Sequence, residues 1–338
     1  MSKRFLQLFL ILFLFPLFLN AQHYNLLKFK SKDNLAGITI ADLIKDSKNR
    51  IWIATQEGGI GCFNGREFTN YTTSQGLISN DTKTMCEDVQ GNIWIGTISG
   101  LSIFDGIKMT SVKEFGLDTI EIRSIFRDTK NNLYLSTLGN GWIVYDGKKF
   151  HHFSTQNGLP TNSILSTYED HDGNLWVGTY HEGVCKISAQ SIHSSKLDIQ
   201  QYKSDFIGSG SVYCIKQGND KRMWFGTTNS GIYYMDKDQK IIQLELKPEF
   251  STALITDIVE DSNGILWFAS DFGLIKYANH QLKYYTEKQG LSADNITAIA
   301  IDYENNLWIG TSGQGLCILK NEAFLNFNEM DGLPNKSV

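Results

Sequence analysis

The side chains best equipped for chemistry lie in two short segments, Tyr180-His181-Glu182 and Asp271. Their phenol, imidazole and carboxylate groups can exchange protons or form hydrogen bonds with a polar ligand. Arg123 can meet an anionic group, and Gln314 offers an amide at a comparable position in another segment. We therefore expect these six residues to contact a polar ligand, such as a glycan.

The other histidine and acidic residues do not form a catalytic or metal-binding pattern. The histidines lack metal-ligand spacing, and the adjacent His151 and His152 would face opposite sides of a strand. Four aspartates recur at one position of a repeated unit: Asp88, Asp170, Asp261 and Asp302. Recurrence of this kind is better explained by capping of turn N–H groups than by paired catalytic carboxylates. Since a phosphate loop, a nucleophile elbow and a calcium loop are also lacking, we predict no catalytic residue, no metal and no cofactor.

The elements that position these residues follow from an internal repeat. An aromatic residue with aliphatic neighbours recurs at intervals of 40 to 48 residues, at Trp52, Trp94, Tyr134, Trp176, Trp224, Trp267 and Trp308. Each unit is too short to bury its own apolar face, so neighbouring units must stack.

Each unit contains four short β-rich runs joined by turns. In the second copy the turn Gln90-Gly91-Asn92 precedes the aromatic run, and Asp105-Gly106 closes the third run as a two-residue hairpin. The fourth run carries paired aromatics, as in Phe68 and Tyr71, and Phe324 and Phe327 would be their counterparts in the last copy. Seven such units predict an all-β, seven-bladed β-propeller of four-stranded antiparallel blades.

The repeated aromatics are predicted to pack between blades, where a buried large side chain contributes about 1.5–3 kcal/mol. Exposed aromatics that stack on sugars are the competing interpretation. Trp142 lies outside the register of the repeated aromatic.

Residues 1–21 have the features of a cleavable secretory signal. Lys3 and Arg4 precede an apolar stretch from Phe5 to Leu19, and Ala21 offers a cleavage site. The stretch is short for a membrane anchor, so we expect export to the periplasm or the extracellular space. Without the two signal cations the chain has 29 basic and 36 acidic residues, a net charge of −7, which disfavours nucleic acid as a partner.

Five cysteines in an exported chain raise the question of disulfides. Cys62 and Cys317 belong to blades that would touch around a closed ring, but they stand one register step apart and should face opposite sides. We therefore predict that all five are small buried hydrophobic residues.

The repeats resemble a known family. The pattern Glu-Asp-x-x-Gly-Asn-Ile/Leu-Trp-Ile/Val-Gly-Thr, then Gly-Leu and Phe-Asp-Gly, preceded by Gly-Leu-Pro-x-Asn at 158–162, is similar to the two-component regulator propeller repeat. The third copy departs most, with Tyr134 for Trp and Ser136 for Gly, and the fifth lacks the Asp-Gly turn.

The resemblance implies the periplasmic sensor region of a hybrid two-component histidine kinase, without kinase activity in this chain. It also implies a homodimer and a membrane helix formed by regions beyond Val338. Two alternatives remain open. One is a secreted propeller enzyme, such as a polysaccharide lyase, that uses His181 and Tyr180, and the other is a protein-interaction scaffold.

The two ends of the chain predict the domain limits. We assign 22–330 to the propeller and 331–338 to the start of a truncated further repeat, because Gly332 to Val338 resembles the linker Gly158 to Ile164. The chain would then be the leading part of a longer product, or the product of a gene that has lost its tail. Tyr24 to Phe29 resembles an outermost strand without its own blade, and we predict that it closes the ring on Gly315 to Lys320.

Overall fold

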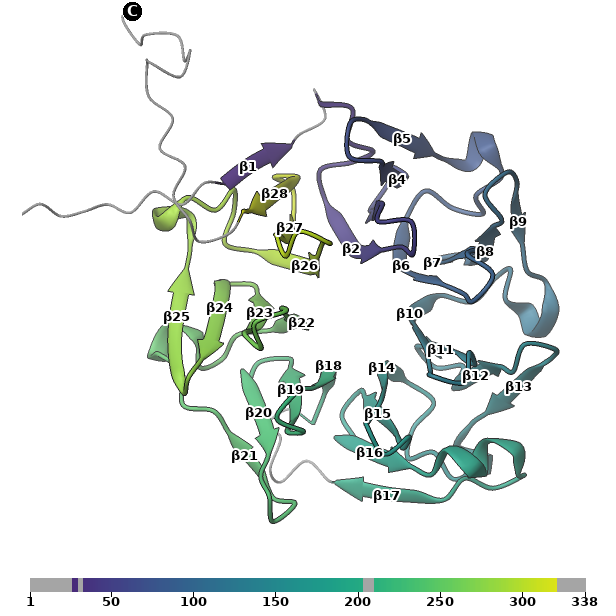
Figure 1. The fold of residues 1–338 in the computed structure, drawn as a ribbon. Helices are drawn as coiled ribbons and strands as arrows, with labels where there is room; N and C mark the ends of the chain where they lie inside the picture. Colours follow the sequence, from purple (N-terminus) through teal and green to yellow (C-terminus); the bar gives the residue numbers. More distant parts are fainter. Residues whose placement is uncertain (1–25, 30–32, 203–209, 321–338) are drawn as a thin grey trace, which may run out of the picture.

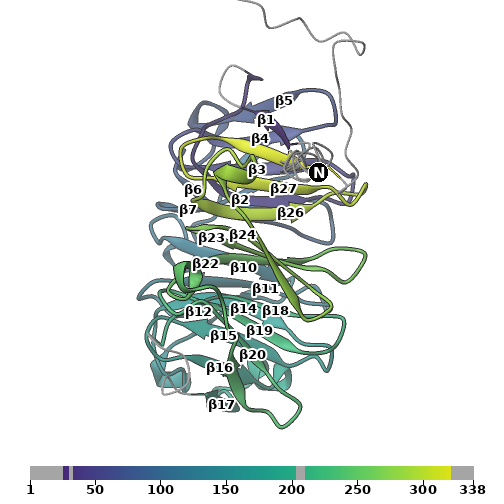
Figure 2. The ribbon, with the colours of Figure 1, turned by 90° about the vertical axis from the view of Figure 1, so that its left-hand side faces the viewer.

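The computed structural model describes residues 26–29, 33–202 and 210–320, which form seven four-stranded antiparallel sheets. The sheets stand around a central channel like the blades of a propeller (Figure 1). Seen from the side, the ring is a flat disc (Figure 2). The predicted fold class is confirmed.

The strands of each blade run from the channel outward in chain order, except in the last blade. The innermost strands are β2 (Ile40–Lys45), β6 (Thr82–Glu87), β10 (Ile122–Arg127), β14 (Ile164–Glu169), β18 (Val212–Gln217), β22 (Ile255–Glu260) and β26 (Ile296–Ile301). The second strands are β3 (Ile51–Thr55), β7 (Ile93–Thr97), β11 (Leu133–Thr137), β15 (Leu175–Thr179), β19 (Met223–Thr227), β23 (Leu266–Ser270) and β27 (Leu307–Thr311). The third strands are β4 (Gly59–Phe63), β8 (Gly100–Phe104), β12 (Trp142–Tyr145), β16 (Val184–Ile187), β20 (Ile232–Met235), β24 (Gly273–Ala278) and β28 (Leu316–Leu319).

The outermost strands are β5 (Phe68–Tyr71), β9 (Met109–Ser111), β13 (Phe150–Phe153), β17 (Ile199–Tyr202), β21 (Ile241–Gln243), β25 (Gln281–Tyr285) and β1 (Leu26–Phe29). Short 3-10 helices lie in the connections: η2 (Thr73–Gln75), η3 (Glu114–Gly116), η4 (Thr155–Asn157), η5 (Ala189–His193), η6 (Pro248–Phe250) and η7 (Glu287–Gln289).

The N-terminal strand closes the ring, as the sequence predicted. β1 pairs antiparallel with β28, with Leu26 opposite Leu319 and Phe29 opposite Leu316. Figure 1 shows β1, the first of the described strands, beside β28, the last of them. The ring of Phe29 stacks parallel to that of Trp308 at 6.4 Å, so the closing strand also covers the core of blade seven. Phe324 and Phe327, the proposed signal and residues 331–338 lie outside the described residues.

The repeated Asp and Trp form one hydrogen-bonded unit at the turn between the first two strands. In blade two, Asp88 Oδ1 accepts from the backbone N–H groups of Gln90 and Asn92, and Trp94 Nε1 donates to Asp88 Oδ2 at 2.9 Å. Six turn aspartates accept from the repeated aromatic in this way: Asp46, Asp88, Asp128, Asp170, Asp261 and Asp302. Blade five has Gly218 at this position, and Trp224 Nε1 is buried without a hydrogen-bond partner. The predicted role of these aspartates as turn caps is confirmed.

The Gly-Thr pair after the aromatic serves the contact with the next blade. A Cβ on Gly96 would lie 2.8 Å from side-chain atoms of Ile122, and a Cβ on Gly310 would lie 2.5 Å from Ile40. The hydroxyl at the end of each second strand donates to a glycine carbonyl across the loop, as from Thr97 Oγ1 to Gly100 at 2.9 Å. Small side chains therefore let the blades approach closely, and the hydroxyl fixes the loop that faces the channel mouth.

Seven hydrophobic clusters fill the spaces between neighbouring blades, and each contains the repeated aromatic of one blade. The predicted packing of these aromatics is confirmed. Trp142 lies outside the register of the repeated aromatic, as the sequence indicated: it is on the third strand opposite Ser136, where Leu101 lies opposite Gly96 in blade two. Its indole stacks on Tyr134 at 5.0 Å and is fully buried, so it supplies bulk where the third copy has the smaller aromatic.

All five cysteines are free thiols. Cys62, Cys185 and Cys317 are buried, as predicted, whereas Cys86 and Cys214 are partly exposed. Cys214 differs because its side chain lies on the innermost strand β18 and lines the central channel.

Candidate ligand site in the central channel

The central channel contains a cavity of about 340 Å³, which is the size of a small-molecule site. All seven innermost strands contribute to its walls, through residues such as Asp42, Lys83, Arg123, Ser166, Tyr213, Asp257 and Thr297. Additional lining comes from Gln56, Leu254 and Asn295 in loops at one mouth of the channel.

A β-bulge gives each blade two channel-facing side chains in succession. In every innermost strand the pairing with the second strand shifts by one residue near its start, as between Ile122 and Ser124 in β10. A bulge leaves one residue unpaired and re-aims its side chain, so strict alternation is broken. Arg123 and Ser124 therefore both line the cavity, and the same holds for the equivalent pairs of the other six blades.

Arg123 is the most conspicuous side chain of the channel. Its guanidinium lies over the ring of Tyr213, 4.5 Å from the centroid, and forms no hydrogen bond or ion pair with the described residues. Burial lowers the pKa of Arg123, an effect opposed by Glu121 and Asp42. Lys83, by contrast, pairs with Asp81 at 2.8 Å. The channel therefore holds one guanidinium with free donors in a partly desolvated place.

Two carboxylates share the cavity with Arg123. Asp42 Oδ1 accepts from Leu43 N, and Asp42 Oδ2 accepts from Met85 N of the next blade at 2.7 Å. Asp257 makes the equivalent bonds with Ile258 N and with Ile299 N of blade seven. Each carboxylate thus links two blades by their backbones.

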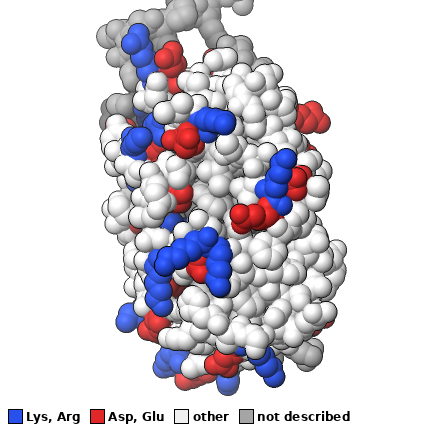
Figure 3. All heavy atoms as spheres, turned by 90° about the vertical axis from the view of Figure 1, so that its right-hand side faces the viewer, with Lys and Arg blue, Asp and Glu red and all other residues white. Residues whose placement is uncertain are grey.

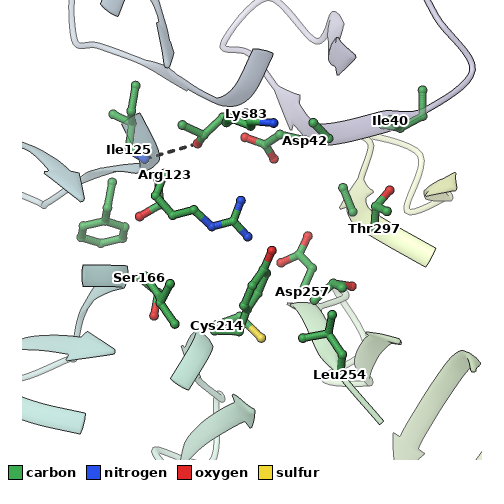
Figure 4. Close-up of a pocket in the computed structure, with 18 of the residues that line it drawn as sticks. Ile40, Asp42, Lys83, Arg123, Ile125, Ser166, Cys214, Leu254, Asp257 and Thr297 are labelled. Atoms are coloured by element: carbon green, nitrogen blue, oxygen red, sulfur yellow. Dashed lines mark hydrogen bonds between the residues drawn. The ribbon is translucent and has the colours of Figure 1, made fainter. Parts of the chain in front are cut away.

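The surroundings of these carboxylates favour their protonated form. Burial raises the pKa of Asp257 to about 7, and the charge of Asp42 adds to this, while the backbone N–H groups oppose it. Burial also raises the pKa of Asp42, against the hydrogen bonds and the nearby Arg123. In Figure 4 the side chains of Arg123, Asp42 and Asp257 point toward the same space.

The structure places only one of the six predicted site residues in the cavity wall. Arg123 lines it, whereas Tyr180, His181, Glu182, Asp271 and Gln314 do not. These five lie in loops between second and third strands, which hydrogen-bond to the blade connections, as from Tyr180 N to Ser163 O and from Asp271 N to Leu254 O. These loops and the blade connections therefore lie on the same face of the ring, and the five residues belong to that face.

The loop residues of blades four and six have local partners. The rings of Tyr180 and His181 lie 4.0 Å apart, and His181 N donates to Ser211 Oγ. Asp271 Oδ1 accepts from Leu254 N at 3.0 Å, and burial raises its pKa. Asp271 thus fixes the connection that leads into β22, while Tyr180 is half exposed.

Asp42, Asp257 and Tyr213 were missed from the sequence. Asp42 and Asp257 stand where the other copies carry Thr, Ser, Cys or Ala, and Tyr213 stands where they carry Ala, Lys, Arg, Leu or Thr. A polar side chain at one of these positions does not disturb the strand pattern of its run, so β-propensity alone does not reveal it.

The outer surface does not present a uniform charge. On the side shown in Figure 3, basic and acidic side chains are interspersed among wide areas of uncharged residues. Within 26–29, 33–202 and 210–320, no group of three or more His, Cys, Asp or Glu side chains could hold a metal ion.

A family model described as two component regulator propeller matches five segments: 76–99, 158–181, 207–229, 249–272 and 290–313. They fall on blades two, four, five, six and seven, each across the first two strands. The two unmatched blades include blade three, which carries Tyr134 and Ser136 at the repeat positions.

Among curated proteins, a histidine kinase designated P4 from Formosa agariphila is 30% identical over 176 residues. The match covers 46% of this chain and 13% of that protein, so the chain spans a small part of its relative's length. Among solved structures, the extracellular domain of BT3049 from B. thetaiotaomicron, described as a hybrid two component system, superposes with a TM-score of 0.74. It is 23% identical, with 88% of this chain and 41% of that chain covered.

The same fold also occurs in an enzyme. A virginiamycin B lyase from Staphylococcus aureus superposes with a TM-score of 0.69 at 18% identity, covering 88% of this chain and 99% of the lyase. At this identity the likeness concerns the fold alone. No helix among the described residues has the length and apolar character needed to cross a bilayer.

Proposed function

We propose that this chain, whose blades carry the two component regulator propeller repeat, is the exported ligand-sensing part of a two-component regulator. Its role is to bind a polar ligand in the central channel, and it has no kinase activity of its own. The histidine kinase match and the likeness to an extracellular domain of a hybrid system support this assignment.

The observation that carries the proposal is the guanidinium of Arg123 in the channel wall. A buried or partly buried cation without an anionic partner is costly, and natural sites keep such groups for a ligand or for catalysis. The described surroundings of Arg123 offer the face of Tyr213 and leave its N–H donors free. A rigid ring built from seven similar blades has no structural need for this arrangement, because the equivalent residue is Ala41 in blade one and Leu165 in blade four.

The test is a thermal-shift screen of the purified chain with sugars, organic acids, amino acids and short peptides. A ligand of the channel should raise Tm for the wild type and for Arg127→Gln, but not for Arg123→Gln. Arg127 is the matched control because it belongs to the same strand and is exposed. If no compound of any class raises Tm, or if Arg123→Gln responds like the wild type, the channel is not the sensing site.

A polysaccharide lyase is the second candidate, and the close pair of Tyr180 and His181 rings at the channel face is the observation in its favour. A lyase forms an unsaturated product that absorbs in the ultraviolet. Incubation with acidic polysaccharides should give no such absorbance if the chain is a sensor. Turnover that His181→Ala abolishes would decide for the enzyme.

A further inference from the structure

The channel holds one guanidinium and two carboxyl groups. Burial raises the pKa of both carboxyl groups, whereas a cationic ligand group beside them would favour their charged form. No ion pair joins Arg123 to Asp42 or Asp257, although Arg123 and Asp42 affect each other's pKa. The carboxylates accept backbone N–H groups, which leaves lone pairs on each oxygen for a further donor. Figure 4 shows all three side chains directed into the space between them.

This charge distribution discriminates between classes of ligand. A simple anion would form an ion pair with Arg123 but would be repelled by the carboxylates of Asp42 and Asp257. A simple cation would form ion pairs with the two carboxylates but would be repelled by Arg123. A neutral polyol would displace water and leave the guanidinium without a charged partner, at a desolvation cost. A molecule with both an ammonium and a carboxylate satisfies all three groups at once.

The size of the cavity limits the ligand further. At about 340 Å³ it lies at the lower end of the range of about 300–1,000 Å³ that small-molecule sites occupy. That volume suits an amino acid or a dipeptide better than an oligosaccharide chain. Tyr213 adds an aromatic face beside the guanidinium, against which an apolar side chain can pack.

We propose that the channel binds a small zwitterion, an amino acid or dipeptide, whose carboxylate pairs with Arg123 and whose ammonium is accepted by Asp257 and Asp42. The carboxylate would take two parallel N–H donors of the guanidinium, a geometry that Arg supports and Lys does not. This inference rests on the proposed function, because it names the ligand of the same channel.

The test uses calorimetric titration of the purified chain with the common amino acids and with glycyl dipeptides. The best binder is then compared with its carboxamide, which lacks the negative charge, and with its N-acetyl derivative, which lacks the positive charge. Each derivative should bind about tenfold to a hundredfold more weakly than the parent, as expected for loss of a charged hydrogen-bonded pair. Equal binding of the parent and both derivatives would overturn the proposal.

Two variants test which residue contacts each end of the ligand. Arg123→Gln should weaken the parent strongly while leaving the affinity for the carboxamide almost unchanged, because that derivative has no carboxylate to lose. Asp257→Asn should weaken the parent and leave the affinity for the N-acetyl derivative almost unchanged. Arg127→Gln is the control for both, and circular dichroism and Tm show whether each variant is folded.

The outcomes separate this proposal from the assignment as a sensor. If sugars or organic acids bind in an Arg123-dependent manner and zwitterions do not, the sensor assignment stands and the zwitterion proposal fails. If no compound binds in the channel, both fail.

Discussion

The aspartates of the outer turns and those of the central channel have the same side chain in opposite surroundings. At the turn of blade four, Asp170 accepts hydrogen bonds from four donor groups: the backbone N–H groups of Asp172 and Asn174, the Asn174 amide and the Trp176 indole. Burial acts to raise its pKa, but these bonds and Lys186 hold the pKa of Asp170 below its ordinary value. In the channel, the two backbone bonds of Asp257 do not offset burial, and its pKa is raised.

The comparison shows how to distinguish structural carboxylates from those available to a ligand. A carboxylate whose acceptor sites are filled locally is stabilised in its charged form and stabilises the fold in return. A carboxylate with free lone pairs beside a guanidinium that has no ion-pair partner is held at a cost in stability. Such costs are typical of functional sites.

The largest expected effect is on stability, from removal of a turn carboxylate. Asp170→Ala would leave the buried Trp176 Nε1 and two backbone N–H groups of the turn without their acceptor. We expect the free energy of unfolding to fall by about 2–4 kcal/mol, measured by chemical denaturation. Asp172→Ala, at an exposed position of the same turn, is the control and should change it by less than about 0.5 kcal/mol. Equal effects of the two substitutions would contradict the structural role of Asp170.

The channel carboxylate Asp257 should make the stability of the protein fall as pH rises. Because burial raises the pKa of Asp257 to about 7, the folded state keeps a proton that the unfolded chain loses near pH 4. The wild type should therefore lose stability as pH rises from 5 to 8. In Asp257→Asn this loss should be smaller, by about 2 kcal/mol.

The neighbours of Asp257 define the controls for this pH experiment. The titratable groups that interact electrostatically with Asp257 are Asp42, Lys216 and Cys214. Asp238→Asn, at an exposed site, should retain the wild-type dependence on pH. A wild type whose Tm is flat between pH 5 and 8, or a parallel profile for Asp257→Asn, would show that this carboxylate is charged at little cost.

The same contrast explains what could be predicted from the sequence. Trp94, Asp88 and Gly96 repeat because each blade makes the same local contacts, so their period reveals the fold and even the closing strand Leu26–Phe29. Asp42 and Asp257 belong to blades one and six and meet only when the ring closes. Spacing along the chain therefore carries no information about their proximity.

Arg123 was predicted as a ligand contact because it can meet an anionic group, and the structure places it near the start of β10, in the channel. Tyr180 and Asp271 were predicted as ligand contacts from their chemistry alone, which does not fix the direction of a side chain, and neither lines the cavity. The bulge that turns both Arg123 and Ser124 into the channel breaks the two-residue alternation on which such predictions depend.

The smallest expected effect is a gain in stability at the one described blade whose turn lacks the aspartate. In blade five Gly218 replaces it, and the buried Trp224 Nε1 has no acceptor. Gly218→Asp would supply this acceptor, and we expect the free energy of unfolding to rise by about 1 kcal/mol. The backbone of Gly218 is not in the left-handed region, but a Cβ would lie 2.9 Å from the Asp220 carboxylate, which must rotate away.

The control for this gain is Gly218→Ala, which adds the Cβ and removes chain entropy without an acceptor. If Asp and Ala stabilise the protein equally, the gain comes from the backbone and the missing hydrogen bond of Trp224 is of no consequence. If Asp stabilises more, and Trp224→Phe in the same background removes the difference, the turn aspartate acts through the indole N–H. That result would extend to blade five the structural role which separates the turn carboxylates from Asp42 and Asp257.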